Sequence, residues 1–303
     1  MNVSSSSHTV VSSTGGVRQF MQRHPLICYF LMAYGFSWLV WVPYELSLDG
    51  LGLLPVHLTQ LGILPGAYLG PLLSGLLMKA ATEGKPGIGR LLRRFVQWRV
   101  GWQWYLFTFL GIPATIFLGF IVLPGALTAL HLTFAQLALY FPLLLLVEIL
   151  TSGLAEEPGW RGFALPRLQE RYGPLWGTVM LGLLWGGWHL PLFLTAWQAG
   201  AGGLGICEFI LGTVGIAIII SWVFNHTQGS LLIAILMHAT VDAFTSTAAA
   251  TGLFSVQWMQ KYEDLAMMIG TGVVALLLII VTRGRLGYKQ TSSASAAEPS
   301  LKS

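Results

Sequence analysis

About eight separate runs of roughly 20 apolar residues constrain the fold of this chain more than any other feature. A helix that crosses the hydrocarbon core of a bilayer needs about 20 such residues. The runs lie at about 26–47, 57–79, 104–126, 133–154, 174–197, 205–224, 230–250 and 265–282. We therefore expect an all-α bundle of about eight transmembrane helices. It would be an integral, multi-pass membrane protein, in the plasma membrane if the source is bacterial.

The scarcity of charge supports the same interpretation. Only 9% of the residues are charged and 54% are hydrophobic, whereas soluble domains carry about 25% charged residues. The formal net charge of +4 comes from basic residues in short clusters between the apolar runs. Such clusters fit the anionic surface of a membrane, so the lipid bilayer is the expected partner and nucleic acid is not.

The basic clusters also predict an orientation. Arg18 and Arg23 precede the first run, and further clusters follow the second, fourth and eighth runs. The loops of the opposite side carry acidic residues, with Lys261 as their one basic residue. Because Lys and Arg concentrate in cytoplasmic loops, eight spans with both termini in the cytoplasm satisfy this alternation.

The chain divides into a single membrane domain with polar ends. We expect disordered tails at 1–16 and 287–303, and one transmembrane domain at 17–286. Cys28 and Cys207 both fall inside apolar runs and are interpreted as buried free thiols. The segment from Pro86 to Trp102 is read either as an interfacial amphipathic helix or as an ordinary basic loop.

Six ionisable residues lie where an apolar helix should exclude them. A charged side chain at the centre of a membrane helix costs about 2.5–3.5 kcal/mol on insertion scales, so such residues are functional candidates. Three stand at the end of the fourth run, one in the fifth and two in the seventh. They are Glu156, Glu157, Arg161, His189, His238 and Asp242.

The spacing within this set matters. Glu157 and Arg161 are four residues apart, so they can pair on one helical face. Pro158 stands between them and disfavours helical geometry at Glu157, so we expect a kink, with a helix restarting at Pro158. His238 and Asp242 are also four residues apart, as are Trp185 and His189.

Each of these residues also has a structural interpretation. Glu157 with Arg161 fits an interfacial ion pair, His189 alone fits an interfacial histidine, and His238 with Asp242 fits a hydrogen bond between helices. Glu148 and Glu208 are acids elsewhere in the spans and are read as structural or cavity-lining. The joint occurrence favours function, because three spans each bring polar groups that can meet in one cavity.

A carboxylate beside a histidine suits the activation of water. The carboxylate can take a proton from water, and the oxyanion that forms on an attacked carbonyl needs positioned donors such as His238. Ser152 and Ser246 have no visible activating partner in the sequence. A covalent nucleophile is therefore the weaker hypothesis.

The same residues resemble the motifs of a known family. Glu156-Glu157-Pro-Gly-Trp-Arg161 resembles the EExxxR motif of the CAAX protease and bacteriocin-processing (CPBP, or Abi) family. Trp185-Gly-Gly-Trp-His189 looks like its second motif, and His238-Ala-Thr-Val-Asp242 like its third, HxxxN or HxxxD. The resemblance covers about 130–255.

The resemblance implies an eight-helix intramembrane protease with a conical cavity and a membrane-associated protein or peptide as substrate. It assigns Glu156, together with His189, to the activation of water. It gives Glu157, Arg161 and Trp185 supporting roles, and assigns the oxyanion to His238 and the residue at position 242. This chain has aspartate there, and an ionised aspartate only accepts hydrogen bonds, so we favour orientation of His238 as the role of Asp242.

Metal dependence stays open at the level of sequence. Two histidines and a carboxylate form the ligand set of an open catalytic zinc site, and Glu156, His189, His238 and Asp242 are the candidate ligands. A metal-free glutamate mechanism is the favoured alternative, and no cofactor is assigned. The chain lacks the HExxH motif that would decide for zinc.

Two further functions compete with intramembrane proteolysis. A bacteriocin self-immunity protein would bind its partner without catalysis. A transporter would also use buried Glu and His residues. Inverted repeats are expected of many transporters, and we see none in this sequence.

Overall fold

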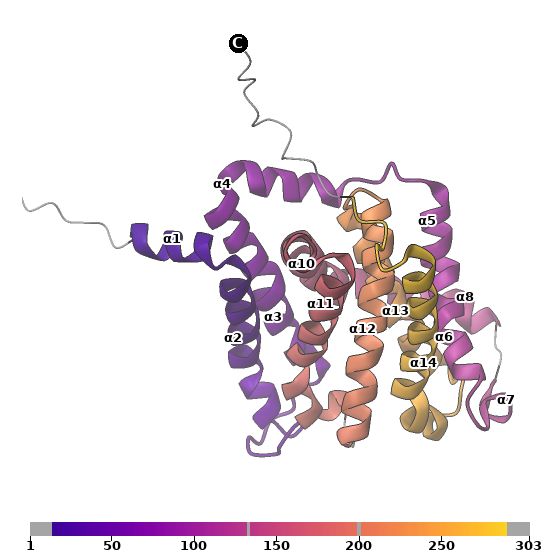
Figure 1. The fold of residues 1–303 in the computed structure, drawn as a ribbon. Helices are drawn as coiled ribbons and strands as arrows, with labels where there is room; N and C mark the ends of the chain where they lie inside the picture. The colour runs from indigo at the N-terminus through magenta and orange to yellow at the C-terminus, as the bar shows by residue number, and fades with distance from the viewer. Residues whose placement is uncertain (1–13, 132–133, 199–200, 290–303) are drawn as a thin grey trace, which may run out of the picture.

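The computed structural model of the chain describes residues 14–131, 134–198 and 201–289 (Figure 1). These ranges are predominantly helical and contain no β-strand. Eight of the helices are long and apolar enough to cross a membrane. The predicted fold class, an all-α integral membrane protein with several spans, is confirmed.

The first span is a single helix, and each of the next three spans is built from two or three helical segments. The first span is α2, Pro25–Leu46. The second joins α3 (Leu64–Ala67) to α4 (Leu73–Phe95) through a π-helical turn. The third joins α5 (Trp102–Leu106) to α6 (Ile112–Ile121), again through a π-helical turn. The fourth comprises α8 (Phe134–Glu148), α9 (Leu154–Gly159) and α10 (Leu165–Tyr172).

The last four spans are simpler. They are α11 (Pro174–Trp188, extended by a 3₁₀ turn to Leu194), α12 (Gly203–His226), α13 (Leu231–Thr251) and α14 (Val256–Thr282). Two short helices, α1 (Thr14–Arg23) and α7 (Ala126–Ala129), lie outside the spans. Each expected run thus corresponds to one span, with ends that differ by several residues, except that the second and fourth spans continue to Phe95 and Tyr172, well beyond their runs.

The second span is much longer than its apolar run, because α4 turns rather than ends. Gly84 adopts φ 65°, ψ −161° inside α4, a conformation open to glycine and strained for other residues. The segment after Gly84 lies across the end of the bundle (Figure 1). The expected interfacial helix at 86–102 therefore forms, but it ends at Phe95 and α5 begins at Trp102.

The fourth span runs through Pro158 instead of restarting there, so that expectation was wrong. Pro158 is the fifth residue of α9, not its first. π-helical turns at Ile149–Gly153 and Trp160–Ala164 flank α9. Each π turn relaxes the hydrogen-bond ladder by one residue, which lets the helix absorb the clash and the missing N–H of proline without stopping.

The chain ends agree only partly with the expected tails. Residues 1–13 and 290–303 lie outside the described residues, so most of both predicted tails is not addressed. Helix α1 begins at Thr14, three residues inside the tail expected at 1–16. Of the two thiols, Cys28 is buried as expected, whereas Cys207 is exposed on α12.

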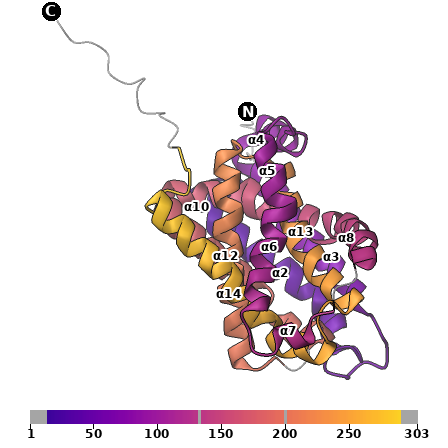
Figure 2. The ribbon, with the colours of Figure 1, turned by 90° about the vertical axis from the view of Figure 1, so that its right-hand side faces the viewer.

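Helix α13 is the centre of the bundle. Its most apolar window is 67% buried, against 6% for the fourth span, whose first part, α8, packs on it from the outside (Figure 2). Glycines allow close approach here. A Cβ on Gly153 would come within 2.8 Å of the Ile235 carbonyl oxygen, and one on Gly75 would lie 3.0 Å from Gly159 Cα. The segment 153–159 is thereby clamped between α4 and α13.

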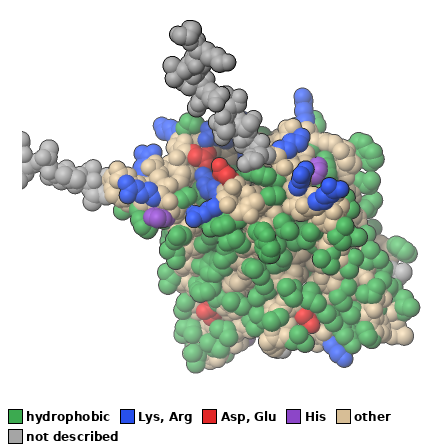
Figure 3. All heavy atoms as spheres, viewed as in Figure 1, with side chains coloured by type: hydrophobic (Ala, Val, Ile, Leu, Met, Phe, Trp, Pro, Cys, Tyr) green, Lys and Arg blue, Asp and Glu red, His purple; other side chains and the backbone are tan. Residues whose placement is uncertain are grey.

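The molecular surface shows an apolar belt between two polar ends. Lys and Arg side chains gather at the end that carries α1 and the second half of α4, while the opposite end shows a few acidic side chains and one basic one (Figure 3). Large hydrophobic side chains such as Leu139, Leu276 and Val281 are at least 60% exposed. In a membrane protein these side chains face lipid.

The orientation with both termini in the cytoplasm stays a prediction, and single cysteines test it. In a background with Cys28→Ala and Cys207→Ser, we expect Arg93→Cys to react with a membrane-impermeant maleimide only after the cytoplasmic side is opened. Lys261→Cys, an exposed position on α14, should react in sealed cells. The reverse pattern would invert the topology.

Candidate active site

The fourth span buries a run of charged side chains in its π-flanked segment. Glu156 is 5% exposed, and Glu157 and Arg161 are both fully buried. Arg161 Nη1 donates to Glu157 Oε1 at 2.6 Å, as their spacing of four predicts. The expected ion pair therefore exists, but in the protein interior and not at the interface.

His238 from α13 completes this ion pair. Its Nδ1 lies 2.9 Å from Glu157 Oε1, the oxygen that also accepts from Arg161. Because a carboxylate only accepts hydrogen bonds, Nδ1 carries the proton. Arg161 of the fourth span and His238 of α13 thus both donate to the same oxygen of Glu157. Little solvent is present there to screen the three groups from one another.

The second nitrogen of His238 faces Asp242. Nε2 lies 3.4 Å from Asp242 Oδ2, and the Asp242 side chain is 35% exposed against 5% for His238. His238 is therefore held between two carboxylates, one buried and one accessible. The contact with Asp242 is an ion pair and not a hydrogen bond in this structure, and orientation of the His238 ring by Asp242 stays a prediction. The Nε2 contact is the longer of the two, so Nε2 is the ring nitrogen more readily redirected to a bound group.

Glu156 is held by two indoles. Its Oε2 accepts from Trp160 Nε1 at 3.0 Å and from Trp185 Nε1 at 2.7 Å. Trp160 is one turn further along the same span and Trp185 lies on α11. Since both donors use Oε2, Oε1 is the oxygen available to bind a water molecule.

His189 reaches this site through Trp185 rather than by direct contact. His189 Nδ1 donates to the Trp185 carbonyl oxygen at 3.0 Å, so Nε2 carries the free lone pair of a neutral ring. The ring stacks on Trp197, with centroids 5.4 Å apart and planes at 10°. In the described ranges, His189 forms neither a hydrogen bond nor an ion pair with Glu156.

Trp185 therefore sits at the junction of the site. Its indole N–H binds Glu156 and its backbone carbonyl binds His189. Its ring contacts two basic side chains, Arg161 and His238. The ring centroid lies 4.5 Å from Arg161 Cζ and 5.0 Å from the His238 ring centroid. An aromatic face attracts a cation most strongly where water is excluded. The supporting role expected for Trp185 thus has a physical basis.

Sequence reasoning missed some partners of the site. Trp160 binds Glu156, and its position four residues after Glu156 was a usable signal. Tyr29 on α2 is fully buried, its hydroxyl has no partner in the described residues, and its ring packs at 5.7 Å on Trp160. No pattern in the sequence of α2 predicts the contact between Tyr29 and Trp160.

The arrangement does not fit a zinc site of the kind considered. Among the described residues no three His, Cys, Asp or Glu side chains are grouped as metal ligands. Both nitrogens of His238 face carboxylates, and Nδ1 of His189 is used on a backbone carbonyl. A zinc ion needs a lone pair on at least one nitrogen of each histidine, and His238 could offer one only from Nε2, by giving up its contact with Asp242.

The residues around this site also carry the likeness to known proteins. A family model for Rce1-like type II CAAX prenyl endopeptidases matches residues 138–244, which contain the three motifs. A curated relative, CAAX prenyl protease 2 of Methanococcus maripaludis, is 30% identical over 117 residues. The resemblance to the CAAX protease family is confirmed. The match covers 37% of this chain and 42% of that relative, less than half of either.

The part of the chain that resembles the CAAX proteases is also the part that builds the site. It runs from α8 to α13 and contains the fourth span, Trp185, His189, His238 and Asp242. The spans α2, α4, α6 and α14 lie wholly or mostly outside it. They supply contacts such as Tyr29 and Gly75 that support the matched segment from behind.

The shared oxygen of Glu157 generates a stability prediction. Arg161→Ala leaves Glu157 buried with less compensation and should lower the free energy of unfolding by about 3–5 kcal/mol. Removing both charges, in Glu157→Gln/Arg161→Met, should cost less than Arg161→Ala alone. Thermal unfolding in detergent measures both. The control is Arg90→Ala, which breaks a pair whose arginine is 54% exposed and should cost no more than about 1 kcal/mol.

Proposed function

We propose that this protein is an intramembrane endopeptidase that hydrolyses a peptide bond of a membrane-associated protein or peptide. The observation that carries the proposal is Glu156. A buried carboxylate is fixed by two indole donors on one oxygen, beside a histidine held between two other carboxylates. The confirmed resemblance supports the same reaction class.

In the proposed reaction Glu156 acts as the base. Its Oε1 takes one proton from a water molecule, and the water oxygen bonds to the carbonyl carbon of the substrate. The Nε2 lone pair of His189 accepts the second hydrogen of that water and orients it. When the tetrahedral intermediate collapses, the C–N bond breaks and the departing amine takes the proton from Glu156.

His238 acts on the opposite side of the carbonyl. The carbonyl oxygen gains negative charge during attack and needs a positioned donor. The Nε2–H of His238 supplies it by leaving its 3.4 Å contact with Asp242. Glu157 and Arg161 keep the ring in place through Nδ1, so one nitrogen stays anchored while the other serves the substrate.

The substrate class follows from the relatives. The curated relative is named a CAAX prenyl protease, so a prenylated C-terminal peptide is the first substrate to test. A non-lipidated membrane peptide is the second. The partly exposed Asp242 marks the side from which the site can be reached.

The test is cleavage of both peptides by the purified protein in liposomes. We expect Glu156→Gln, His189→Ala and His238→Ala each to lower kcat by roughly 10²–10⁴-fold, because each removes a proton-transfer or oxyanion group. Glu208→Gln, an equal change in another span, should retain activity. Gel filtration and thermal unfolding confirm that each variant is folded.

The outcomes separate the competing functions. Full cleavage by folded Glu156→Gln would refute the catalytic assignment. A protective phenotype against a bacteriocin that persists in Glu156→Gln would indicate immunity by binding, and flux into liposomes would indicate transport. We expect a zinc chelator to leave the rate unchanged, and loss of activity that zinc restores would overturn the metal-free mechanism.

A further inference from the structure

A second set of polar side chains continues from the proposed active site along two facing helices. On each helix the residues recur every fourth position and so share one face. The fourth span presents one stripe and α13 presents the other, and the two segments pack together. The stripes are Glu148, Ser152, Glu156 and His238, Asp242, Ser246.

Glu148 is the hub at the far end of these stripes. Its Oε2 accepts from the Thr151 hydroxyl at 3.0 Å and lies 3.5 Å from the Ser152 hydroxyl. Its Oε1 accepts from Ser246 of α13 at 3.3 Å. A carboxylate in a membrane span must find such donors, and here one of them comes from the helix that carries His238.

Asp242 lies between this hub and the site. It faces His238 on one side, and its charge acts on Glu148 on the other. Ser246, one turn along α13 from Asp242, joins this helix to Glu148. The Ser152 hydroxyl, whose one hydrogen is closest to the Glu148 backbone carbonyl oxygen at 3.1 Å, stays with Glu148. Two carboxylates repel each other in a medium of low dielectric, which turns Asp242 away from Glu148 and toward the His238 ring.

We propose that Glu148 is a positioning residue of this site. Through its own charge, and through Ser246 on the next turn of α13, it fixes the rotamer of Asp242, and through Asp242 it fixes the ring of His238. The inference rests on the proposed function for its effect on rate. The coupling between Glu148 and Asp242 is a physical property of the fold and does not depend on catalysis.

Two measurements on the same variants test the proposal. Glu148→Gln should lower kcat by roughly tenfold to a hundredfold while KM stays within about twofold, because the substrate does not touch Glu148. Glu148→Asp should restore part of the rate. Glu208→Gln, the matched loss of a membrane carboxylate on α12, should leave kcat unchanged.

A thermal unfolding cycle separates this inference from the proposed function. The Tm changes of Glu148→Gln and Asp242→Asn should not add in the double variant, because the two carboxylates act on each other. Additive Tm changes would overturn the inference whatever the activity. Non-additive changes in a protein that cleaves no peptide would uphold the coupling and refute the protease assignment instead.

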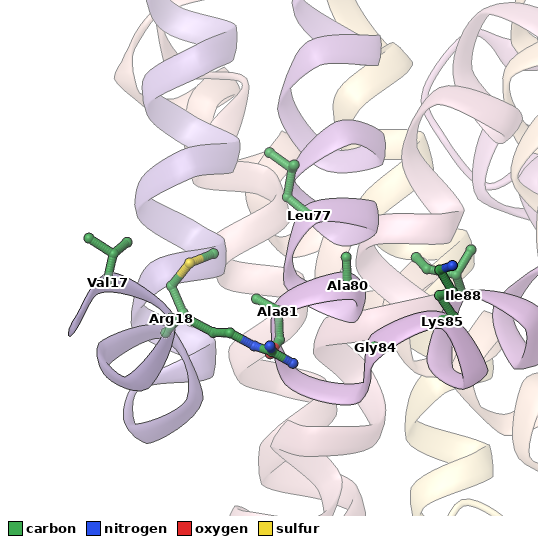
Figure 4. A pocket seen from close by; sticks show the side chains of 9 residues that line it. Val17, Arg18, Leu77, Ala80, Ala81, Gly84, Lys85 and Ile88 are labelled. Carbon is green, nitrogen blue, oxygen red and sulfur yellow. The ribbon is translucent and has the colours of Figure 1, made fainter. Parts of the chain in front are cut away.

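A different part of the molecule carries a second, independent inference. An open hollow of about 870 Å³ lies between α1 and α4, away from the polar site (Figure 4). Its lining is mostly apolar and includes Met21, Leu77 and Ile88, with Arg18 and Lys85 as its two cations. It forms where α4 turns at Gly84 from a spanning to an interfacial direction.

Charge around the hollow is positive and partly oriented. Arg18 Nε donates to the Ala81 carbonyl oxygen at 3.2 Å, which fixes the guanidinium at the turn. Next to Gly84, Glu83 is surrounded by Lys79, Arg90 and Arg167 at 2.6–2.7 Å. That cluster keeps a surplus of two positive charges, so an anion at the hollow meets a net positive field.

We propose that this hollow binds one phospholipid with an anionic headgroup. The apolar lining takes the upper part of the acyl chains, and Arg18 and Lys85 bind the phosphate and the further negative charge of the headgroup. A guanidinium presents paired N–H donors that match phosphate oxygens. The surrounding bilayer supplies such lipids directly at the depth where the hollow opens.

Native mass spectrometry of the purified protein with added phosphatidylglycerol or phosphatidylcholine tests the site. We expect one retained phosphatidylglycerol, bound roughly tenfold more tightly than phosphatidylcholine. Arg18→Gln/Lys85→Gln should abolish the preference. Arg93→Gln/Arg99→Gln removes the same charge from exposed positions outside the hollow and should retain it.

A steric pair completes the test. Ala80→Trp places a bulky ring in the hollow and should prevent binding of the retained lipid, whereas Ala138→Trp on the exposed face of α8 should not. Equal affinity for both lipids, or equal loss in the two double variants, would mean that only general surface charge acts. Either result would overturn the proposal.

Discussion

The site depends on one buried carboxylate oxygen. Oε1 of Glu157 accepts from Arg161 and from His238, and neither donor has solvent to replace it. Removing three charges from water is costly unless their partners are correctly placed. The fold must therefore hold the fourth span and α13 in one register. Gly153 lets the fourth span approach α13 closely, and Gly75 and Gly159 let the second span pack against the fourth from the other side.

Around that oxygen the polar groups are divided by function. Arg161 and Glu157 are fully buried and engage each other, so they define geometry. Glu156 keeps one oxygen free of the indole donors and Asp242 is partly exposed, so in the proposed reaction these two meet water and substrate. His238 contacts both groups: its Nδ1 contacts the buried Glu157, and its Nε2 contacts the partly exposed Asp242. All of these residues lie inside the segment 138–244 that resembles the CAAX proteases.

The sequence predicted the spans because hydrocarbon imposes a length and a composition that few other structures satisfy. It predicted that several ionisable side chains from different spans meet, because an ionisable residue in a span is costly enough to be informative; their catalytic roles stay a prediction. It could not predict that the fourth span continues through Pro158, since π-helical turns depend on packing by neighbouring helices and leave no simple residue pattern. It also could not predict that His189 meets Glu156 only through Trp185, because spacing gives the face of a helix and not the reach between helices.

The adjacency of Glu156 and Glu157 has a geometric reason. Consecutive residues on a helix point about 100° apart, so two neighbouring carboxylates on one helix can address two different partners. Glu156 turns to Trp185 on α11 and Glu157 turns to His238 on α13. The two partners also contact each other, because the ring of Trp185 packs against the ring of His238. A pair spaced by four would have faced one helix only, and would have left either the water-binding carboxylate or the histidine anchor without its partner.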